Sequence, residues 1–396
     1  MSCPLLRLLV AGPAALVLTM GIGRFAYTPI LPLMQRDLGL GDALAGALAA
    51  ANNAGYLAGA LGAGLIPLIW RGPLFRLALI ASVATTALSG FSADPWTLGL
   101  LRFGSGLASG AIFVQAGATV LDALRQAGRA SWGGVHFAGV GLGIALSGAV
   151  VLALAEGDWR LPWYALGGLG VLLALPCWAW LSGPSASAPA AAPRSASGPM
   201  NPRLAVLHVG YFADGLGYVV TATFLSSLLA RVFADVGVAA GAAAWIVVGL
   251  AGAPSSVLWS LVGARVGIPA ALGAAFALQA LGVVLPLAGG VPSVVIGAAL
   301  FGGTFIAITA LTLARGAAIA GGASARVAST LTVAFGLGQI AGPVIAGIVA
   351  DASGSLAPSL WGAAAVLVMG GAASVWGAAE PSRPATAKSP GSNLSP

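Results

Sequence analysis

The stretch LAVLHVGYFADGLGYVVTATFLSSLLA, residues 204–230, decides the fold class of this chain. As a helix it is long enough to cross the hydrocarbon core of a bilayer, about 30 Å thick, at roughly 1.5 Å per residue. It lacks the alternation of apolar and polar positions that marks the strands of a membrane barrel. The run at residues 241–263 shares both properties. We therefore expect membrane-spanning helices, because within lipid the backbone must satisfy its own hydrogen bonds.

The composition of the whole chain extends this expectation. Hydrophobic residues make up 59% of the 396 residues, charged residues make up 7%, and the mean hydropathy is +0.98. These values exclude an ordinary soluble domain. The apolar runs predict an all-α membrane protein with about twelve transmembrane helices, at residues 8–33, 44–69, 74–92, 96–121, 131–155, 162–181, 204–230, 241–263, 268–288, 292–316, 326–350 and 357–378.

A segment rich in proline, serine and alanine divides the chain at residues 182–203. Such a composition cannot build a packed core, so we interpret the segment as a cytoplasmic linker. The predicted domains are a bundle of six helices at residues 1–181 and a second one at residues 204–380. The remaining residues, 381–396, are predicted to form a disordered cytoplasmic tail.

The two predicted bundles echo each other in sequence. The tripeptide Gly-Ile-Gly at residues 21–23 matches Gly-Leu-Gly at residues 215–217, and Gly-Leu-Gly at residues 141–143 recurs at residues 336–338. The offsets are 194 and 195 residues. This agreement near both ends of the halves predicts a duplication, and parallel repeats are typical of one large class of transporters.

The basic residues predict the orientation in the membrane, because lysine and arginine are retained on the cytoplasmic side. With both termini in the cytoplasm, the cytoplasmic segments would hold twelve of them, namely Arg7, Arg71, Arg76, Arg125, Arg129, Arg194, Arg203, Arg265, Arg315, Arg326, Arg383 and Lys388. The opposite loops would hold three, namely Arg36, Arg160 and Arg231. We therefore predict a multi-pass protein of the bacterial inner membrane, and interpret the net charge of +7 as a consequence of topology.

Asp214 lies near the middle of residues 204–230, at a depth where a charge is costly unless it is paired or faces water. On a regular helix it shares a face with Tyr211, Tyr218 and Thr221. A carboxyl group in a low dielectric can take up and release a proton when its access to water changes. We expect Asp214 to couple proton movement to transport or to contact a solute. The alternative is a fixed hydrogen bond at a helix contact.

Arg24 is a second charge within an apolar run, and it shares a helical face with Met20 and Tyr27. Under the repeat offset its counterpart is Tyr218. A guanidinium group stays charged, and its planar fork suits a carboxylate. Three interpretations remain open at this point. Arg24 binds an anionic solute, or it pairs with Asp214, or it is a structural arginine whose head reaches the membrane surface.

Three motifs resemble a known family. They are GIGRFAYTPILPLM at residues 21–34, YFADGLGYVVTATFL at residues 211–225 and GLGQIAGP at residues 336–343. The chain resembles the major facilitator superfamily over essentially its whole length, and its motifs are similar to those of the uncharacterised YbfB/YjiJ-like bacterial branch. The resemblance implies two six-helix bundles around a central cavity, lined by the first and seventh helices, and alternating access. It implies no particular substrate.

Further polar residues within the predicted helices complete the candidate site. Together with Arg24 and Asp214, the predicted substrate-binding or coupling residues are Tyr27, Asn52, Tyr56, Gln115, Tyr218 and Gln339. Arg102 begins the segment RFGSGLASG, which resembles a superfamily signature, and is predicted to act on conformation through a polar partner on a neighbouring helix. Gly342 and Pro343 are predicted to act on conformation as well, since glycine allows close helix contact and proline removes a backbone donor. Ordinary helix packing is the alternative for each of these residues.

Enzymatic motifs are missing from the sequence. A G-x-G-x-x-A match at residues 21–26 lies inside a predicted transmembrane helix with no preceding strand, and Walker A, H-E-x-x-H and G-x-S-x-G patterns do not occur. Cys3 and Cys177 are too few for a metal site or a disulfide framework. We therefore predict that the protein is not an enzyme, that it holds no cofactor or metal, and that it binds no nucleic acid.

These observations predict a secondary active transporter that moves a small organic solute by alternating access and is coupled to protons. Its expected partners are the solute, protons and the lipid bilayer, and it is expected to be a monomer. Efflux is the favoured direction, because sparse polar anchors in apolar walls suit loosely specified solutes. Uptake of a small organic anion through Arg24 is one alternative, and a membrane sensor or scaffold without transport activity is the other.

Overall fold

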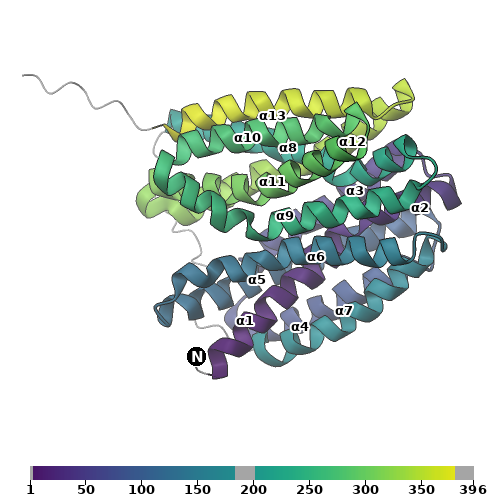
Figure 1. Ribbon diagram of the computed structural model, residues 1–396. Coiled ribbons are helices and arrows are strands. Elements are labelled where there is room, and N and C mark those ends of the chain that lie inside the picture. Colours follow the sequence, from purple (N-terminus) through teal and green to yellow (C-terminus); the bar gives the residue numbers. More distant parts are fainter. Residues whose placement is uncertain (1–2, 183–200, 380–396) are drawn as a thin grey trace, which may run out of the picture.

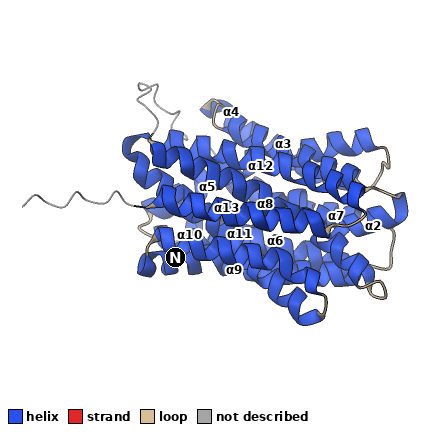
Figure 2. Cartoon of the chain, turned by 90° about the horizontal axis from the view of Figure 1, so that it is seen from above, coloured by secondary structure: helices blue, strands red, loops and turns tan. Residues whose placement is uncertain are grey.

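The computed structural model describes residues 3–182 and 201–379, and helices with their connecting turns make up all of this described part (Figure 2). Eleven helices are long and apolar enough to cross a membrane, the first of them running from Leu5 to Leu38. A twelfth long helix, Asp42–Ala63, has a sequence diluted by glycines and by two asparagines. The predicted all-α membrane fold of about twelve transmembrane helices is confirmed.

The first half of the described chain ends at Leu181. Its elements are α1 (Cys3–Leu16), η1 (Val17–Phe25), α2 (Tyr27–Leu38), α3 (Asp42–Ala63), α4 (Leu68–Leu88), α5 (Pro95–Gln126), η2 (Ala130–Trp132), α6 (Gly133–Ala153) and α7 (Arg160–Leu181). The first three elements form one continuous crossing.

The second half begins at Pro202. Its elements are α8 (Pro202–Val232), α9 (Gly237–Val266), α10 (Ile268–Val284), η3 (Leu285–Ala288), α11 (Val291–Ala320), η4 (Gly321–Ala323), α12 (Ser324–Ser353) and α13 (Ala357–Ala378). The predicted linker and the predicted tail fall almost wholly on residues 183–200 and 380–396, outside the described part of the chain.

The boundary between the second and third crossings differs from the prediction. We expected helices at residues 44–69 and 74–92, but α3 ends at Ala63 and α4 already begins at Leu68. Pro67 precedes α4 in an extended conformation, with φ of −57° and ψ of 146°, and it has no N–H to continue a helix. Hydropathy missed this break because the residues on both sides of Pro67 are apolar.

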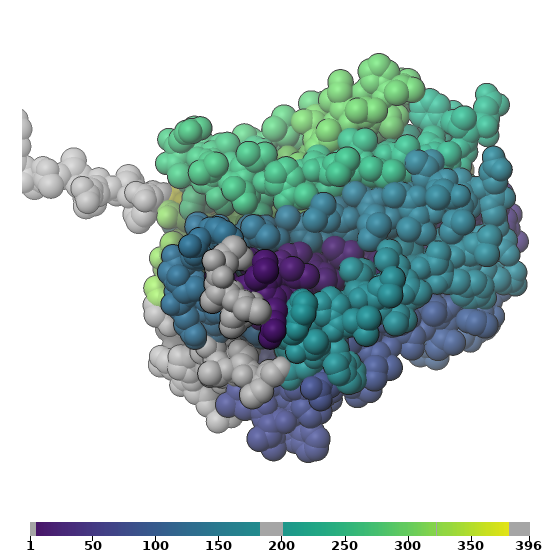
Figure 3. Space-filling view, turned by 60° about the horizontal axis from the view of Figure 1, so that its bottom comes forward, coloured from purple at the N-terminus to yellow at the C-terminus, as the bar shows by residue number. Residues whose placement is uncertain are grey.

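The two halves lie one above the other in Figure 1, with α8–α13 in green and yellow above α1 and α4–α7 in purple to teal. The space-filling view shows the same stacking on another face of the molecule (Figure 3). The described chain starts and ends at the same end of the bundle, where Cys3, Leu181, Pro202 and Ala378 lie. We call this the terminal end and the opposite one the distal end.

Glycines bring the halves together along two seams. A Cβ atom on Gly141 of α6 would collide with the backbone of Gly249 and Ala253 in α9. On the other seam, a Cβ atom on Gly46 of α3 would collide with the carbonyl group of Pro343 in α12. Small residues permit such close backbone contact, which is a common means of helix association in lipid. These seams enclose the space between the halves.

Candidate functional site

A cavity of about 380 Å³ lies between the halves, where both contribute to its walls. The first half contributes Arg24, Phe25, Tyr56, Phe113 and Phe137, and the second half contributes Tyr218, Phe305, Phe335 and Gln339. Tyr211, Ser256, Leu313 and Thr332 also line it, and each lies in the half of its helix nearer the terminal end. The cavity therefore extends from Arg24, near mid-depth, toward the terminal end.

The helix that carries Arg24 is distorted in a way that the sequence did not predict. Residues Val17–Phe25 form a π-helix between the α-helical segments α1 and α2. Such wide turns are rare, and they concentrate at functional sites because they displace carbonyl groups from the regular ladder. Side chains of neighbouring helices donate hydrogen bonds to these carbonyl groups and so stabilise the wide turn.

Gly23 provides the most heavily used of these carbonyl groups. It accepts hydrogen bonds from Ser105 Oγ at 2.8 Å, Arg102 Nη1 at 3.2 Å and Asn52 Nδ2 at 3.3 Å. Arg102 Nη2 donates in addition to the carbonyl group of Arg24 at 3.1 Å. The polar partner expected for Arg102 is thus the backbone of η1. Asn52 also donates to backbone carbonyl groups. The amide of Asn52 and the guanidinium group of Arg102 therefore support the backbone, and neither is assigned to a solute.

Arg24 points from this support into the interface between the halves. Its Nη2 atom donates to Gln339 Oε1 at 2.6 Å, to Asn53 Oδ1 at 3.0 Å and to the Tyr218 hydroxyl group at 3.3 Å. The centre of the guanidinium group lies 4.4 Å from the centroid of the Tyr56 ring. Its Nε atom is buried without an acceptor in the described chain. Only 6% of the residue is exposed, so the charge sits in a low dielectric.

The carboxyl group of Asp214 lies elsewhere. Its Oδ1 atom accepts a hydrogen bond from Gln279 Nε2 of α10 at 3.3 Å, and its Oδ2 atom is buried without a partner in the described chain. Neither Arg24 nor Asp214 belongs to an ion pair among the described residues. The alternative in which these two charges pair is therefore not realised in this conformation.

The helical geometry of α8 explains the separation. Tyr211 and Tyr218 both line the cavity, but Asp214 does not. Asp214 lies three residues after Tyr211 and four before Tyr218, so on an α-helix its side chain is rotated by about 40–60° from theirs. This rotation is enough to give Asp214 a different neighbouring helix. The shared face that we expected is therefore split between the cavity and α10, against Gln279.

The other predicted residues are distributed over the interface. The Tyr27 hydroxyl group donates a hydrogen bond to the carbonyl group of Ala45 at 3.1 Å. Gln339 bridges Arg24 and Tyr218, because its Nε2 atom donates to the tyrosine hydroxyl group at 2.6 Å. The structure therefore brings together Arg24, Tyr56, Tyr218 and Gln339 at the cavity, and places Tyr27 outside its lining.

Three further predicted residues lie away from the cavity lining, as Asp214, Tyr27, Asn52 and Arg102 do. Gln115 Nε2 is buried without a partner in the described chain, and the residue does not line the cavity. A Cβ atom on Gly342 would meet Val219 Cγ1 at 2.6 Å, which places this glycine in the seam between α12 and α8. Pro343 lies inside α12, and its carbonyl group faces Gly46. The structure thus places Gly342 and Pro343 at helix contacts.

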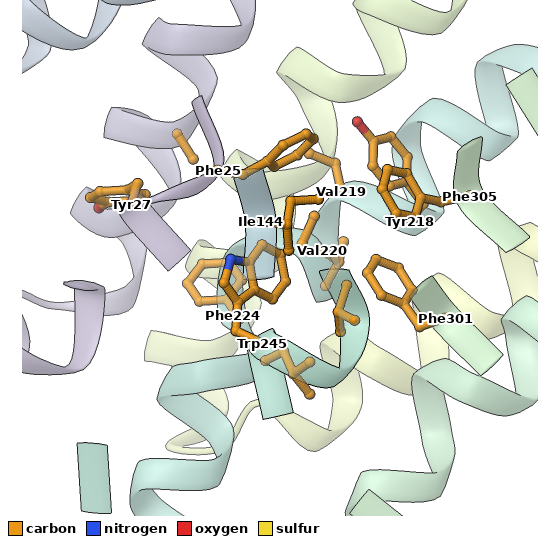
Figure 4. Packing of buried hydrophobic residues seen from close by; sticks show 14 of the residues in the cluster. Phe25, Tyr27, Ile144, Tyr218, Val219, Val220, Phe224, Trp245, Phe301 and Phe305 are labelled. Atoms are coloured by element: carbon orange, nitrogen blue, oxygen red, sulfur yellow. The ribbon is translucent and has the colours of Figure 1, made fainter. Parts of the chain in front are cut away.

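The sequence did not predict the aromatic wall of the cavity. The ring of Tyr218 stacks on Phe305 with a centroid distance of 5.9 Å and on Phe335 with a centroid distance of 5.4 Å, and the interplanar angles are 5° and 3°. Figure 4 shows Tyr218 and Phe305 side by side. Phe335 also stacks on Tyr211, at 4.4 Å. A phenylalanine on an apolar helix carries no signal that separates a cavity wall from a lipid contact.

The distal end is closed by polar contacts between the halves. Arg231, at the end of α8, donates to both carboxylate oxygens of Asp42 at 2.6 and 2.9 Å. The carboxylate of Asp351, in the last turn of α12, accepts hydrogen bonds from the backbone N–H groups of Asp42 and Ala43 at 2.9 and 3.0 Å. A carboxylate at the start of a helix satisfies free N–H groups and complements the helix dipole. Both contacts cross from one half to the other.

A hydrogen bond and an aromatic contact extend this closure toward the cavity. The Thr28 hydroxyl group donates to the carbonyl group of Ala222 in the other half. Phe25 packs against Trp245 of α9, with ring centroids 6.3 Å apart, and Figure 4 shows the two residues facing each other. The cavity is therefore sealed between its deepest residue, Arg24, and the distal loops.

Two helical halves, a cavity lined by both and a seal at one end define the class of two-bundle membrane transporters. The chain belongs to the family described as uncharacterised MFS-type transporter YbfB, which it matches over residues 16–375. The protein is thus a multi-pass membrane protein and a transporter of the major facilitator type. The resemblance inferred from three sequence motifs is confirmed.

One curated relative is the uncharacterized MFS-type transporter YceJ of Bacillus subtilis (strain 168). It is 26% identical to this chain over 258 residues, which make up 64% of this chain and 65% of that protein. The match therefore spans slightly less than two thirds of the relative.

Solved structures share the fold. A mutant of the nucleoside transporter NupG superimposes with a TM-score of 0.74 at 15% identity, covering 95% of this chain and 98% of its own. A bacterial homologue of the human lysosomal transporter Spinster, in an inward-facing and unoccupied conformation, gives a TM-score of 0.72 at 16% identity and covers 96% and 98%. At such identities the likeness concerns the fold alone.

Proposed function

We propose that the protein is a secondary active carrier of a small organic anion, which Arg24 binds at the floor of the central cavity. One observation carries this proposal. Arg24 is a buried guanidinium group at a cavity lined by both halves, and none of the other residues that line the cavity is charged. An unpaired charge in a low dielectric is costly, and an anionic solute would relieve that cost.

Alternating access provides the transport step in this proposal. Arg24 binds partners on both halves, because Gln339 and Tyr218 belong to the second half and Asn53 to the first. A solute that competes for the guanidinium group would weaken contacts between the halves. The distal seal of Asp42, Arg231 and Asp351 would open as the terminal end closes.

Proton coupling is assigned to Asp214 in this proposal. This carboxyl group is buried at depth in α8 and is held by Gln279 alone, with one oxygen unpaired in the described chain. Movement of α8 against α10 would change its access to water and hence its protonation. The protein would lie in the inner membrane with its terminal end in the cytoplasm, in line with the bias of basic residues toward that end.

A second candidate is the export of neutral or amphiphilic compounds. The observation in its favour is the aromatic wall of Tyr218, Phe305 and Phe335, which offers apolar contact without a fixed polar pattern. In this case Arg24 would serve the conformational change and would not bind the solute.

Purified protein in liposomes distinguishes these functions. Solute exchange is measured with a panel of organic anions, neutral amphiphiles and nucleosides, with and without an inward proton gradient. For the anion carrier, Arg24→Gln lowers anion exchange at least about tenfold, because a charge-assisted hydrogen bond is lost. The matched control is Arg265→Gln, which removes an exposed arginine at the terminal end.

Three results would overturn the proposal. Undiminished anion exchange by the Arg24→Gln variant would remove Arg24 from binding. Movement of neutral amphiphiles alone would favour the second candidate. A protein that moves neither solute nor protons under any gradient would be a sensor or scaffold.

A further inference from the structure

We infer that the cavity is built for a planar aromatic monocarboxylate, with the carboxylate group at Arg24 and the ring between the aromatic walls. This inference rests on the proposed function and specifies the substrate class of the same site. Three independent features support it: the free donors of Arg24, the charge of the cavity lining, and the parallel rings on its second-half wall.

The free donors of Arg24 call for an acceptor. Its Nη2 atom is shared among Gln339, Asn53 and Tyr218. Its Nε atom is buried and lacks an acceptor in the described part of the chain. All three partners are neutral, so none compensates the charge. A guanidinium group presents its donors in a planar fork that matches a carboxylate, which a neutral ligand cannot satisfy as fully.

The charge of the lining selects a monoanion. Arg24 is the one charged residue among those that line the cavity, and the remaining polar lining side chains are neutral hydroxyl and amide groups. One positive charge compensates one negative charge. A dicarboxylate would bring a second charge into an apolar space, where an unpaired ion is costly. A cationic solute would meet like charge.

The aromatic walls of the cavity favour a solute with a flat apolar ring. On the second half, the rings of Phe305, Tyr218 and Phe335 are parallel to within a few degrees. On the first half, Tyr56 and Phe113 lie with their ring centroids 6.0 Å apart. Aromatic rings gain from stacked and edge-on contacts with other rings, beyond the gain from burial alone. A planar ring therefore fits this space better than a saturated one.

The size of the cavity limits the solute. A volume of about 380 Å³ lies at the lower end of the range of roughly 300–1,000 Å³ for small-molecule sites. Thr309, Thr332 and Ser256 line the cavity beyond the aromatic wall, toward the terminal end. They offer hydrogen bonds to a hydroxyl or ether group on the far side of the ring. The expected solute is thus a small aromatic acid with one or two rings.

A matched set of probes tests this inference on the full-length protein in detergent. The probes are 3-phenylpropionate, its amide, 3-cyclohexylpropionate, phenylsuccinate and 3-phenylpropylamine. Dissociation constants are measured by calorimetry above pH 6, where the acids are ionised. We expect 3-phenylpropionate to bind at least about tenfold more tightly than the amide, the dianion and the amine. It should bind about threefold or more tightly than the cyclohexyl acid.

Two variants assign these preferences to the structure. Arg24→Gln should abolish the preference for the acid over its amide, whereas the control Arg265→Gln should retain it. Phe335→Leu should reduce the preference for the phenyl over the cyclohexyl acid and keep the preference for the acid. Because the second variant leaves Arg24 in place, the inference stays testable even where Arg24→Gln does not fold.

The outcomes separate this inference from the proposed function. Equal binding of the phenyl and cyclohexyl acids, with both preferred over the amide, would overturn the aromatic specificity and leave the anion carrier intact. Equal binding of the acid and the amide would overturn both. Preference for phenylsuccinate over 3-phenylpropionate would overturn the selection of a monoanion.

Discussion

The leading helices of the two halves occupy equivalent places in the fold, yet the buried charges that they carry have different partners. Arg24 lies in a π-helical turn and reaches partners on both halves. Asp214 lies in the regular helix α8 and contacts Gln279 within its own half. The first charge joins the halves at the cavity, and the second is shielded from it. Helices in equivalent places therefore do not give their buried charges the same surroundings.

Two pairs of positions related by the repeat offset are in direct contact. Arg24 binds Tyr218 and Thr28 binds Ala222, and each pair is separated by 194 residues. Equivalent positions of two repeats meet only close to the axis that relates them, so these contacts mark the centre of the molecule. The same offset relates Asp214 to Met20, which lines the cavity although Asp214 does not. The π-helical turn changes which residues of the first helix face inward.

The largest expected effect separates coupling from binding. Asp214→Asn should abolish accumulation of solute driven by a proton gradient, because the asparagine cannot titrate. Exchange without a gradient should stay within about twofold, since the side chain lies outside the cavity lining. Both rates are measured in liposomes. Asp122→Asn, which changes an acid paired with Arg125 on the surface of α5, is the control. Gradient-driven accumulation at full rate in the Asp214 variant would show that this charge has no coupling role.

The next effect concerns the support of the π-helix. Gly21→Ala should lower the free energy of unfolding by about 1–3 kcal/mol, because the new Cβ atom collides with the backbone of Gly143 in α6. Thermal unfolding in detergent measures the loss. Gly168→Ala is the matched control, since no atom lies within 4 Å of its Cβ position. Equal stability of the two variants would mean that η1 does not need its close contact with α6.

A smaller effect tests the shape of the guanidinium group. Arg24→Lys keeps the positive charge but loses the planar fork, in which Nη2 serves Gln339, Asn53 and Tyr218 while Nε lacks an acceptor in the described chain. We expect anion affinity to fall about tenfold, or roughly 1.4 kcal/mol. Calorimetry with 3-phenylpropionate measures the change. If the lysine variant binds as tightly as the natural protein, charge alone carries recognition and the π-helical geometry of η1 is not required for it.

The smallest effect concerns the distal seal. Arg231→Gln should shift the balance toward a conformation open at the distal end, by less than about 1 kcal/mol, because the Arg231 side chain is 44% exposed and the pair is screened by solvent. Labelling of a cysteine placed in the seal reports the shift. Arg160→Gln, whose partner Asp158 lies in the same half, is the control. Identical labelling of the two variants would assign the closure to apolar packing and to Asp351.

The course of the chain through the membrane could be predicted from the sequence because each crossing is a local property. Apolar runs of sufficient length gave every long helix, and most ends were close to those observed. The prediction was wrong between residues 63 and 68, where Pro67 interrupts a run that stays apolar on both sides. Hydropathy averages over a window and therefore does not register a single residue that lacks a backbone donor.

The candidate site was only partly predictable. Arg24, Tyr56, Tyr218 and Gln339 were singled out because polar groups are rare within apolar helices, and the structure brings them to the cavity. The phenylalanine wall gave no such signal.

The sequence by itself determined that this protein crosses a membrane as two sets of helices and that two charges lie at depth. Composition and the length of apolar runs suffice for the crossings, because the bilayer acts on each helix separately, and the segment at residues 182–203 marks the division into two sets. The tertiary structure alone decided that Arg24 faces the cavity and that Asp214 turns to Gln279. It also decided that residues 17–25 form a π-helix, since the donors that hold its carbonyl groups come from α3 and α5, far away in the chain.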